Sequence, residues 1–217
     1  MTKKIYRWLT IAILPVLACC YPKGAEYAEE LDLVYTNYSK EFDFKTNTTY
    51  AMPDSVIKID GDNFDDPDGD GKPKFLASTY STVILAKLTE HLNAYGWTRV
   101  NKNSNPDVII LPTTMTTTNI YYYYDWWYWS WWYPYWDPWY GWYYPGSYYP
   151  AYITGYRSGS VFIQMIDNTV PPVSGDNIPV VWSCIVNGLA EGSTANITTR
   201  IQSSLDIAFA QSSYLKH

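Results

Sequence analysis

Hydrophobic patterning along the first half of the chain predicts three strands. Residues 31–35 and 49–59 are rich in β-branched and aromatic types and are bounded by polar turn formers, which is typical of strands. Residues 107–115 open with Val108-Ile109-Ile110-Leu111, a short apolar run that predicts a buried strand.

A β-hairpin is predicted in the second half of the chain. Residues 160–167 alternate Val, Ile and Met with Phe, Gln and Ile, and residues 179–186 place Val180, Trp182, Cys184 and Val186 at alternate positions. The polar link 168–177 makes these two segments antiparallel neighbours, with those four side chains on one face.

Two amphipathic helices are predicted from apolar residues at helical spacing. The first covers 80–95, and Gly96 follows where a left-handed capping residue is expected. The second closes the chain and begins at a cap formed by Thr194 or Asn196. The apolar positions that define this closing helix are Ile197, Ile201, Leu205 and Ala208 or Phe209.

These elements together predict an α+β fold. Helices that cover one face of a mostly antiparallel sheet bury both apolar stripes. We therefore expect such a sheet with two helices on one face, within a single domain of residues 31–217, plus a long aromatic loop or hairpin extension.

The first eighteen residues have the layout of a secretory signal peptide. A basic start precedes an eleven-residue apolar run, which is shorter than the roughly 20 residues that a membrane-spanning helix needs. The segment Val16-Leu17-Ala18-Cys19 resembles a lipobox, after which Cys19 would be acylated and residues 19–30 would form a tether. Cys20 is the alternative acylation site, because the motif can also be placed one residue later.

Loss of residues 1–18 removes three positive charges and changes the net charge from −6 to −9. An acidic chain without a lysine or arginine cluster is a poor match for phosphate backbones, so nucleic acid is not an expected partner. Cys184 is the one cysteine outside the Cys19-Cys20 pair, which excludes a disulfide framework and predicts a small buried hydrophobic residue.

The most unusual segment is the aromatic tract, residues 121–150, in which eight tryptophans and twelve tyrosines make up twenty of thirty residues. Three interpretations stay open: a loop that folds back on the sheet, a contact with the membrane interface, and a binding surface for glycan or protein. The tryptophans that would supply such a binding surface are Trp126, Trp127, Trp129, Trp131, Trp132, Trp136, Trp139 and Trp142.

The aspartate-rich segment 60–73 is predicted to be a surface loop. Asp66, Asp68 and Asp70, followed by Gly71, reproduce the opening of a calcium loop, so Ca²⁺ is the one cofactor that the sequence suggests. Ala77 stands where the bidentate glutamate of an EF-hand would be, which favours a solvated acidic loop instead.

No catalytic signature accompanies these features. The two histidines are His91 and the terminal His217, and the chain has no glycine-rich phosphate loop and no metal-spaced cysteine and histidine cluster. The sequence therefore predicts a non-catalytic protein with no catalytic residues.

The order of these segments resembles the DUF4136 family of bacterial lipoproteins, especially those of Bacteroidetes. The resemblance is carried by Ala94-Tyr95-Gly96-Trp97, by Pro106-Asp107-Val108-Ile109-Ile110, by the strand Gly159 to Asp167, by Val181-Trp182 and by the helix with Arg200-Ile201. It implies an envelope lipoprotein of unknown activity, held by acyl chains in the outer membrane bilayer. We expect an interaction or structural role for the aromatic tract with another envelope protein, or alternatively the binding of glycan or peptidoglycan.

Overall fold

The computed structural model describes residues 33–59, 69, 72–115, 127–134, 142–143, 159–169, 178–187 and 193–217. Residues Asp32–His217 form one compact unit, and residues 1–32 lie outside the described residues. The strands are β1 (Leu33–Tyr38), β2 (Thr49–Ala51), β3 (Ile57–Ile59), β4 (Thr98–Arg99), β5 (Val108–Met115), β6 (Trp142–Tyr143), β7 (Ser160–Asp167) and β8 (Ile178–Asn187). The helices are α2 (Ser78–Ala94), α3 (Trp127–Ser130) and α4 (Thr194–Gln211), with short 3₁₀ turns η2 (Lys102–Ser104) and η4 (Ser213–Leu215).

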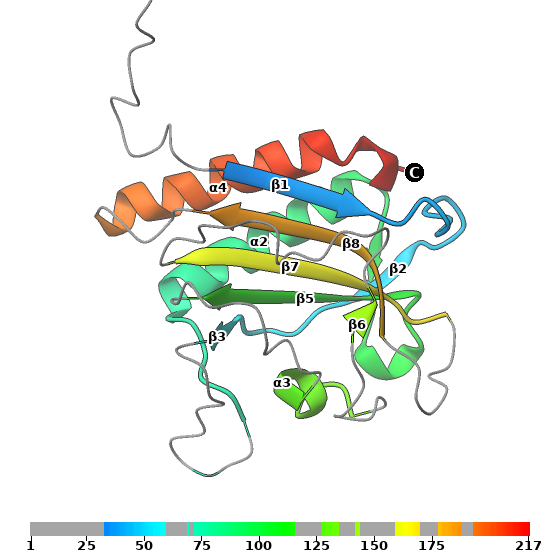
Figure 1. Ribbon diagram of the computed structural model, residues 1–217, viewed down its shortest axis with the longest axis horizontal. Helices are drawn as coiled ribbons and strands as arrows, with labels where there is room; N and C mark the ends of the chain where they lie inside the picture. The colour runs from blue at the N-terminus through cyan, green and yellow to red at the C-terminus, as the bar shows by residue number, and fades with distance from the viewer. Residues whose placement is uncertain are drawn as a thin grey trace, which may run out of the picture. The chain divides into compact units, whose positions relative to one another are not determined.

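A mixed, mostly antiparallel sheet forms the centre of the fold, which confirms the predicted α+β class. Its main path runs β1-β8-β7-β5-β2-β4 (Figure 1). The long strands β1, β8, β7 and β5 are antiparallel to one another, whereas the short strands β2 and β3 pair with β5 in parallel.

The two long helices lie on the same face of the sheet, as expected, and we call this the first face. In Figure 1, α2 runs behind the strands and α4 follows the β1 side. Apolar side chains of both helices share one core with alternate residues of the central strands. The residues at the centre of this core are Ile84, Leu88, Ile201, Leu205, Val108, Ile110, Ile163, Met165 and Trp182.

The opposite side of the sheet, which we call the second face, has a core of its own. It contains Ile109 and Leu111 of β5 and Phe162 of β7, which alternate with the residues of the first core. Trp129 and Tyr133 of the aromatic tract belong to this second core. The sheet is therefore buried on both sides, by helices on one side and in part by the aromatic tract on the other.

The end of α2 agrees with the sequence prediction. Gly96 has a φ of +93°, and its N–H donates to the carbonyl of Asn93 at 3.0 Å. The N–H of Trp97 donates to the carbonyl of Leu92 at 2.9 Å, which completes a Schellman motif. The chain therefore turns back sharply into β4, a strand that the hydrophobic pattern does not predict.

Several predicted boundaries were wrong. The strand expected at 49–59 is divided into β2 and β3, because Pro53 lacks the N–H that a continuous ladder needs. Strand β1 continues to Tyr38, beyond the predicted end at residue 35. Helix α4 is capped by Ser193, whose side chain accepts from the N–H of Asn196, and not by Thr194 or Asn196.

The prediction that Val180, Trp182, Cys184 and Val186 lie on one face of β8 was also partly wrong. A bulge lies between Met165 and Ile166 of β7, so that Met165 pairs with Trp182 and Ile166 pairs with Val180. Val181 is the extra residue, and the side chains on either side of it change face. Val180 therefore packs in the second core, whereas Trp182, Cys184 and Val186 pack in the first.

Among the residues that the structure describes, no helix has both the length and the apolar character needed to cross a bilayer.

Candidate aromatic binding surface

Residues 127–134 of the aromatic tract pack against the second face of the sheet through Trp129 and Tyr133. Its helical turn α3 places the indole of Trp129 in the core, where it is 1% exposed, and Tyr133 follows at 4%. Both rings pack with strand residues of the second face, such as Leu111 and Ile166. Burial of two large aromatic side chains favours one position for this segment.

Polar contacts add to this apolar attachment. The Tyr133 hydroxyl donates to Oδ1 of Asn168 at 2.8 Å, and Asn168 Nδ2 donates to the carbonyl of Pro106 at 2.7 Å. The N–H of Asn168 donates to the carbonyl of Asp107 at 2.9 Å. Asn168, directly after β7, thus links the aromatic segment to the beginning of β5.

Lys102 of the 3₁₀ turn η2 contacts the same segment from another side. Its Nζ donates to the carbonyl oxygen of Trp132 and lies 5.4 Å from the centre of the Trp132 ring. An ammonium group at this distance is attracted by the negative face of the indole. Lys102 and Trp132 are both half-buried.

Trp131 extends the aromatic surface toward Phe75. The two rings meet edge to face, with centroids 5.2 Å apart at 71°. Phe75 is 39% exposed, and Trp131 is half-buried. We call Phe75, Trp131, Trp132 and Lys102 the aromatic patch.

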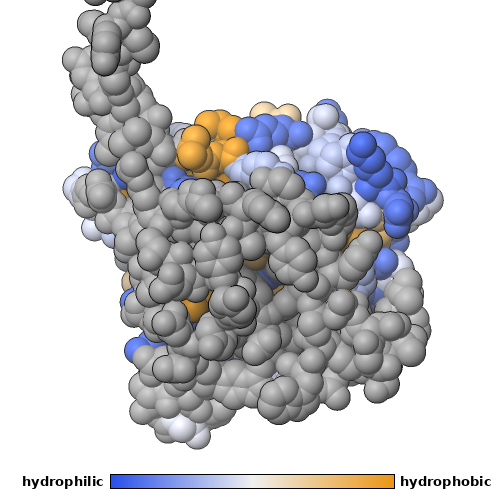
Figure 2. Space-filling view, in the orientation of Figure 1, coloured by the Kyte–Doolittle hydropathy of each residue, from blue (hydrophilic) through white to orange (hydrophobic). Residues whose placement is uncertain are grey.

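This patch is distinct from the other exposed apolar positions of the described residues. Leu33 is 65% exposed at the start of β1, and Ile207 is 49% exposed on α4. Figure 2 shows a small apolar area near the start of β1 beside a mostly hydrophilic surface over α4. Half-buried rings also meet at Tyr38, Phe42 and Tyr214 beside the first core. Among the described residues, the aromatic patch is where a lysine ammonium lies over a tryptophan ring.

The structure brings together some of the predicted binding tryptophans and buries one of them. Trp131 and Trp132 belong to the patch, whereas the ring of Trp129 is enclosed in the core and offers no face to a ligand. The side chains of Trp126, Trp127, Trp136, Trp139 and Trp142 lie outside the described residues.

The predicted lipidation and calcium residues also fall outside the part of the chain that the structure describes. They are Cys19, Cys20, Asp66, Asp68 and Asp70. Within the described ranges, no group of three or more His, Cys, Asp or Glu side chains is arranged to hold a metal ion.

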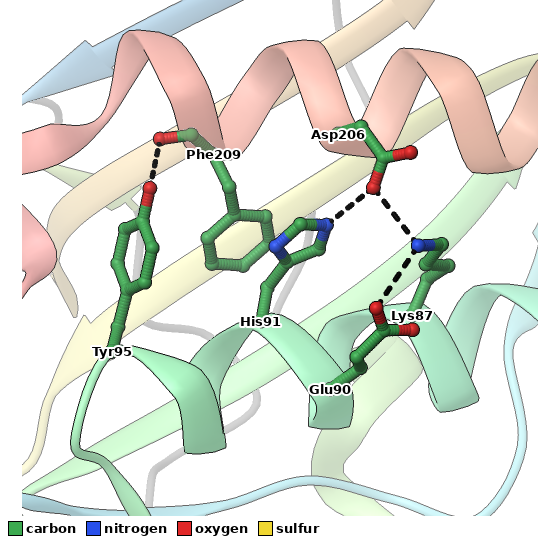
Figure 3. A network of polar contacts seen from close by, with 6 residues as sticks. All are labelled: Lys87, Glu90, His91, Tyr95, Asp206 and Phe209. Atoms are coloured by element: carbon green, nitrogen blue, oxygen red, sulfur yellow. Dashed lines mark hydrogen bonds and ion pairs between the residues drawn. The ribbon is translucent and has the colours of Figure 1, made fainter.

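A second polar cluster joins α2 to α4 on the helical side of the molecule (Figure 3). Oδ1 of Asp206 lies 2.7 Å from His91 Nε2 and 2.9 Å from Lys87 Nζ, and Lys87 also contacts Glu90 at 3.2 Å. Partial burial alone would raise the pKa of Asp206, but hydrogen bonds from Lys87 and His91 hold that pKa below its ordinary value. The hydrogen bond to Asp206 raises the pKa of Lys87.

The His91 cluster has the geometry of a helix cross-link. The imidazole stacks on the buried ring of Phe209, with centroids 4.5 Å apart at 11°, and the Tyr95 hydroxyl donates to the Phe209 carbonyl at 2.7 Å (Figure 3). Among the described residues, the His91 ring contacts Asp206 and Phe209, and neither offers a hydroxyl or thiol that it could activate.

Cys184 is buried in the first core, as its sequence context predicts. Its side chain is 0% exposed, and burial raises the pKa of the thiol far above its ordinary value. The reactive thiolate form is therefore strongly disfavoured.

Sequence reasoning missed the polar side chains of the second face. Thr113, Gln164 and Ser183 are between 0% and 5% exposed there, on three adjacent strands. The only signal was Gln164 between Phe162 and Ile166 in an otherwise apolar alternation. Lys102 was missed as well, because nothing local in the sequence connects it to a tryptophan thirty residues later.

Comparison with known structures finds one good match and weaker ones. A DUF4136 family protein from Bacteroides thetaiotaomicron VPI-5482 is 31% identical, with a TM-score of 0.64 over 85% of this chain and 97% of that one. The PelC dodecamer from Paraburkholderia phytofirmans is 12% identical, with a TM-score of 0.34 over 86% of this chain and 99% of that one. A PDZ domain protein from Parabacteroides distasonis ATCC 8503 is 16% identical, with a TM-score of 0.43 over 86% of this chain and 37% of that one.

The last two proteins superpose too poorly to bear on the fold or the function. A search of curated proteins finds no match to this chain. The family defined as a domain of unknown function, DUF4136, matches residues 34–212, which span β1 to the end of α4. The chain therefore belongs to the DUF4136 family.

Proposed function

We propose that this protein is a non-catalytic envelope lipoprotein that binds a partner through its aromatic patch. The observation that carries this proposal is the attachment of residues 127–134 to the sheet. Trp129 and Tyr133 are buried, while the neighbouring Trp131 and Trp132 stay half-exposed beside Phe75. A rigid base that presents exposed tryptophans is a common feature of binding surfaces.

A glycan is the second candidate for the bound partner, and the composition of the patch favours it. Trp and Phe rings offer flat apolar faces, and the Lys102 ammonium adds a polar contact over the Trp132 ring. Sugar rings likewise combine apolar C–H faces with polar edges, so they complement such a surface.

Binding assays on the full-length chain in detergent would test the role of the patch. We expect the protein to cosediment with peptidoglycan sacculi or to bind envelope oligosaccharides in calorimetry. Trp131→Ala and Trp132→Ala should each weaken this binding at least tenfold. Ile207→Ala is the matched control, because it removes an exposed apolar side chain from α4 and should leave binding unchanged.

Binding that survives both tryptophan substitutions would contradict a role for the patch. The membrane-interface interpretation predicts a different result. A Cys19→Ser, Cys20→Ser double variant would then still float with liposomes, and Trp132→Ala would abolish that flotation.

The proposed anchor is an acylated Cys19 in the outer membrane, supported by the lipobox Val16-Leu17-Ala18-Cys19. Metabolic labelling with a palmitate analogue, followed by mass spectrometry of the N-terminal peptide, tests it. Cys19→Ser should abolish labelling, and Cys20→Ser should retain it. The reverse pattern would assign Cys20 as the anchor.

A further inference from the structure

Lys102 is a half-buried cation at the aromatic patch, and no carboxylate of the described residues forms an ion pair with it. Its contacts in the described residues are the Trp132 carbonyl and the Trp132 ring. No carboxylate of those residues lies within ion-pair distance of it. The other cations nearby in sequence differ, since Lys87 contacts Asp206 and Arg99 contacts Asp54 at 2.7 Å.

The surroundings of Lys102 favour the arrival of an anion. An ammonium group has three N–H donors, and the Trp132 carbonyl accepts from only one of them. A ring face and a peptide carbonyl stabilise the cation partially, but a carboxylate would form a stronger, charge-assisted hydrogen bond.

The aromatic rings beside Lys102 determine what kind of anion fits. Trp132 lies under the ammonium, Trp131 directly precedes Trp132 in the chain, and Phe75 meets Trp131 edge to face. A ligand whose carboxylate reached Lys102 would have to place the rest of its atoms against these rings. A pyranose ring with a carboxylate substituent has both parts in one rigid unit.

We infer that the aromatic patch binds an acidic saccharide, with its carboxylate on Lys102 Nζ and its sugar ring against Trp131 and Trp132. This inference rests on the proposed function and specifies its ligand class. The acidic net charge of the protein does not oppose it strongly, because charges more than about 8–10 Å away are screened at physiological salt. The local contact with Lys102 then sets the preference.

A pair of matched probes tests the inference. Tri-galacturonate and α-1,4-linked galactotriose (galactotriose below) have the same linkage, but the first has a carboxylate where the second has a hydroxymethyl group. Calorimetry with the full-length chain in detergent should show at least tenfold tighter binding of tri-galacturonate. Lys102→Gln should remove this preference and leave the weaker binding of galactotriose, whereas Lys102→Arg should retain it.

Two controls separate charge from folding. Lys40→Gln removes an exposed lysine outside the patch and should not change either affinity. The unfolding midpoint of each variant shows whether the fold is intact, and Lys102→Arg reports on the charge even if Lys102→Gln loosens the aromatic segment. Trp132→Ala should weaken the binding of both saccharides by the same factor.

Equal affinity for the two saccharides, or an unchanged preference in Lys102→Gln, would overturn the inference and leave the patch as a neutral binding surface. Binding of neither saccharide at millimolar concentration would also overturn it, while the sacculus assay would still judge the proposed function separately. If a tri-glutamate peptide bound as tightly as tri-galacturonate, the inferred ligand would be an acidic peptide and not an acidic saccharide.

Discussion

Asp107 joins the beginnings of two strands with a single carboxylate oxygen. Its Oδ2 accepts from the N–H of Thr48 and Thr49 at 2.9 Å each and from the Thr49 hydroxyl at 2.7 Å. Asp107→Asn replaces a charged acceptor with a neutral amide, so we expect the free energy of unfolding to fall by about 1–3 kcal/mol at pH 7. Urea unfolding of the full chain measures this, with the exposed Glu41→Gln as a control that should have little effect.

The same carboxylate predicts a dependence of stability on pH. Partial burial would raise the pKa of Asp107, but the hydrogen bonds from Thr49 and Thr48 outweigh it and hold the pKa below its ordinary value. The stabilising contribution is therefore present above the ordinary aspartate pKa and is lost as the pH falls through the lowered value. Between pH 5 and about pH 2.5, the free energy of unfolding should fall more steeply with decreasing pH for the wild type than for Asp107→Asn. Parallel curves would contradict this.

Gly96 is a position where only glycine fits well. Its φ of +93° strains any other residue, and an added Cβ would lie 2.9 Å from Cβ of His217. Gly96→Ala should lower the free energy of unfolding by about 1–2 kcal/mol or more. Adding His217→Gly removes the collision but not the strained φ, so partial recovery is expected in thermal melts. Full recovery would show that the collision alone is the cause.

The α2 and α4 pair is held together more by packing than by charge. Phe209 is 1% exposed and contacts the rings of His91, Tyr95 and Trp182. Phe209→Ala should lower the free energy of unfolding by about 3–5 kcal/mol. Asp206→Asn breaks two ion pairs, yet the Asp206 side chain is 50% exposed. This variant should therefore lower the free energy of unfolding by about 1 kcal/mol or less. A larger loss in Asp206→Asn than in Phe209→Ala, measured by urea unfolding, would reverse this order.

Elements with a long, regular pattern could be predicted from the sequence, whereas local irregularities could not. Helix α2 was visible in the spacing of Ile84, Leu88 and Leu92, and its Gly96 cap is a strong stop signal. The bulge at Val181 was not visible, because an alternating pattern does not show where one extra residue enters. One strand was predicted over residues 49–59, although Pro53 could have indicated the break between β2 and β3, since proline interrupts a ladder.

The candidate site was predictable only in part. Composition singled out the aromatic tract, but periodicity could not separate the buried Trp129 from the half-exposed Trp131 and Trp132. That separation depends on which side of α3 meets the sheet. The contact between Lys102 and Trp132 joins two segments by tertiary folding alone, and no local rule connects them.

At the scale of the whole molecule, the aromatic tract is both part of the core and part of the surface. Trp129→Ala should lower the free energy of unfolding by about 3–5 kcal/mol, as for other buried aromatic residues. Trp132→Ala removes a half-buried ring that contacts a cation, and it should lower the free energy of unfolding by about 1 kcal/mol. Urea unfolding combined with the sacculus assay should show loss of stability in the first variant and loss of binding in the second. Similar stabilities of the two variants would mean that the tract does not contribute to the core.

The order of the strands also determines where a bound ligand would be held. Strand β1, which continues from the N-terminal part of the chain, lies at one edge of the sheet, and Phe75 of the patch pairs by a β-bridge with Ile57 in β3, beyond β8, β7 and β5. At about 4.8 Å per strand, these two edges are roughly 20 Å apart. A ligand held at the aromatic patch would therefore leave the β1 edge of the sheet uncovered, so that the start of the folded unit and the patch could be engaged at the same time.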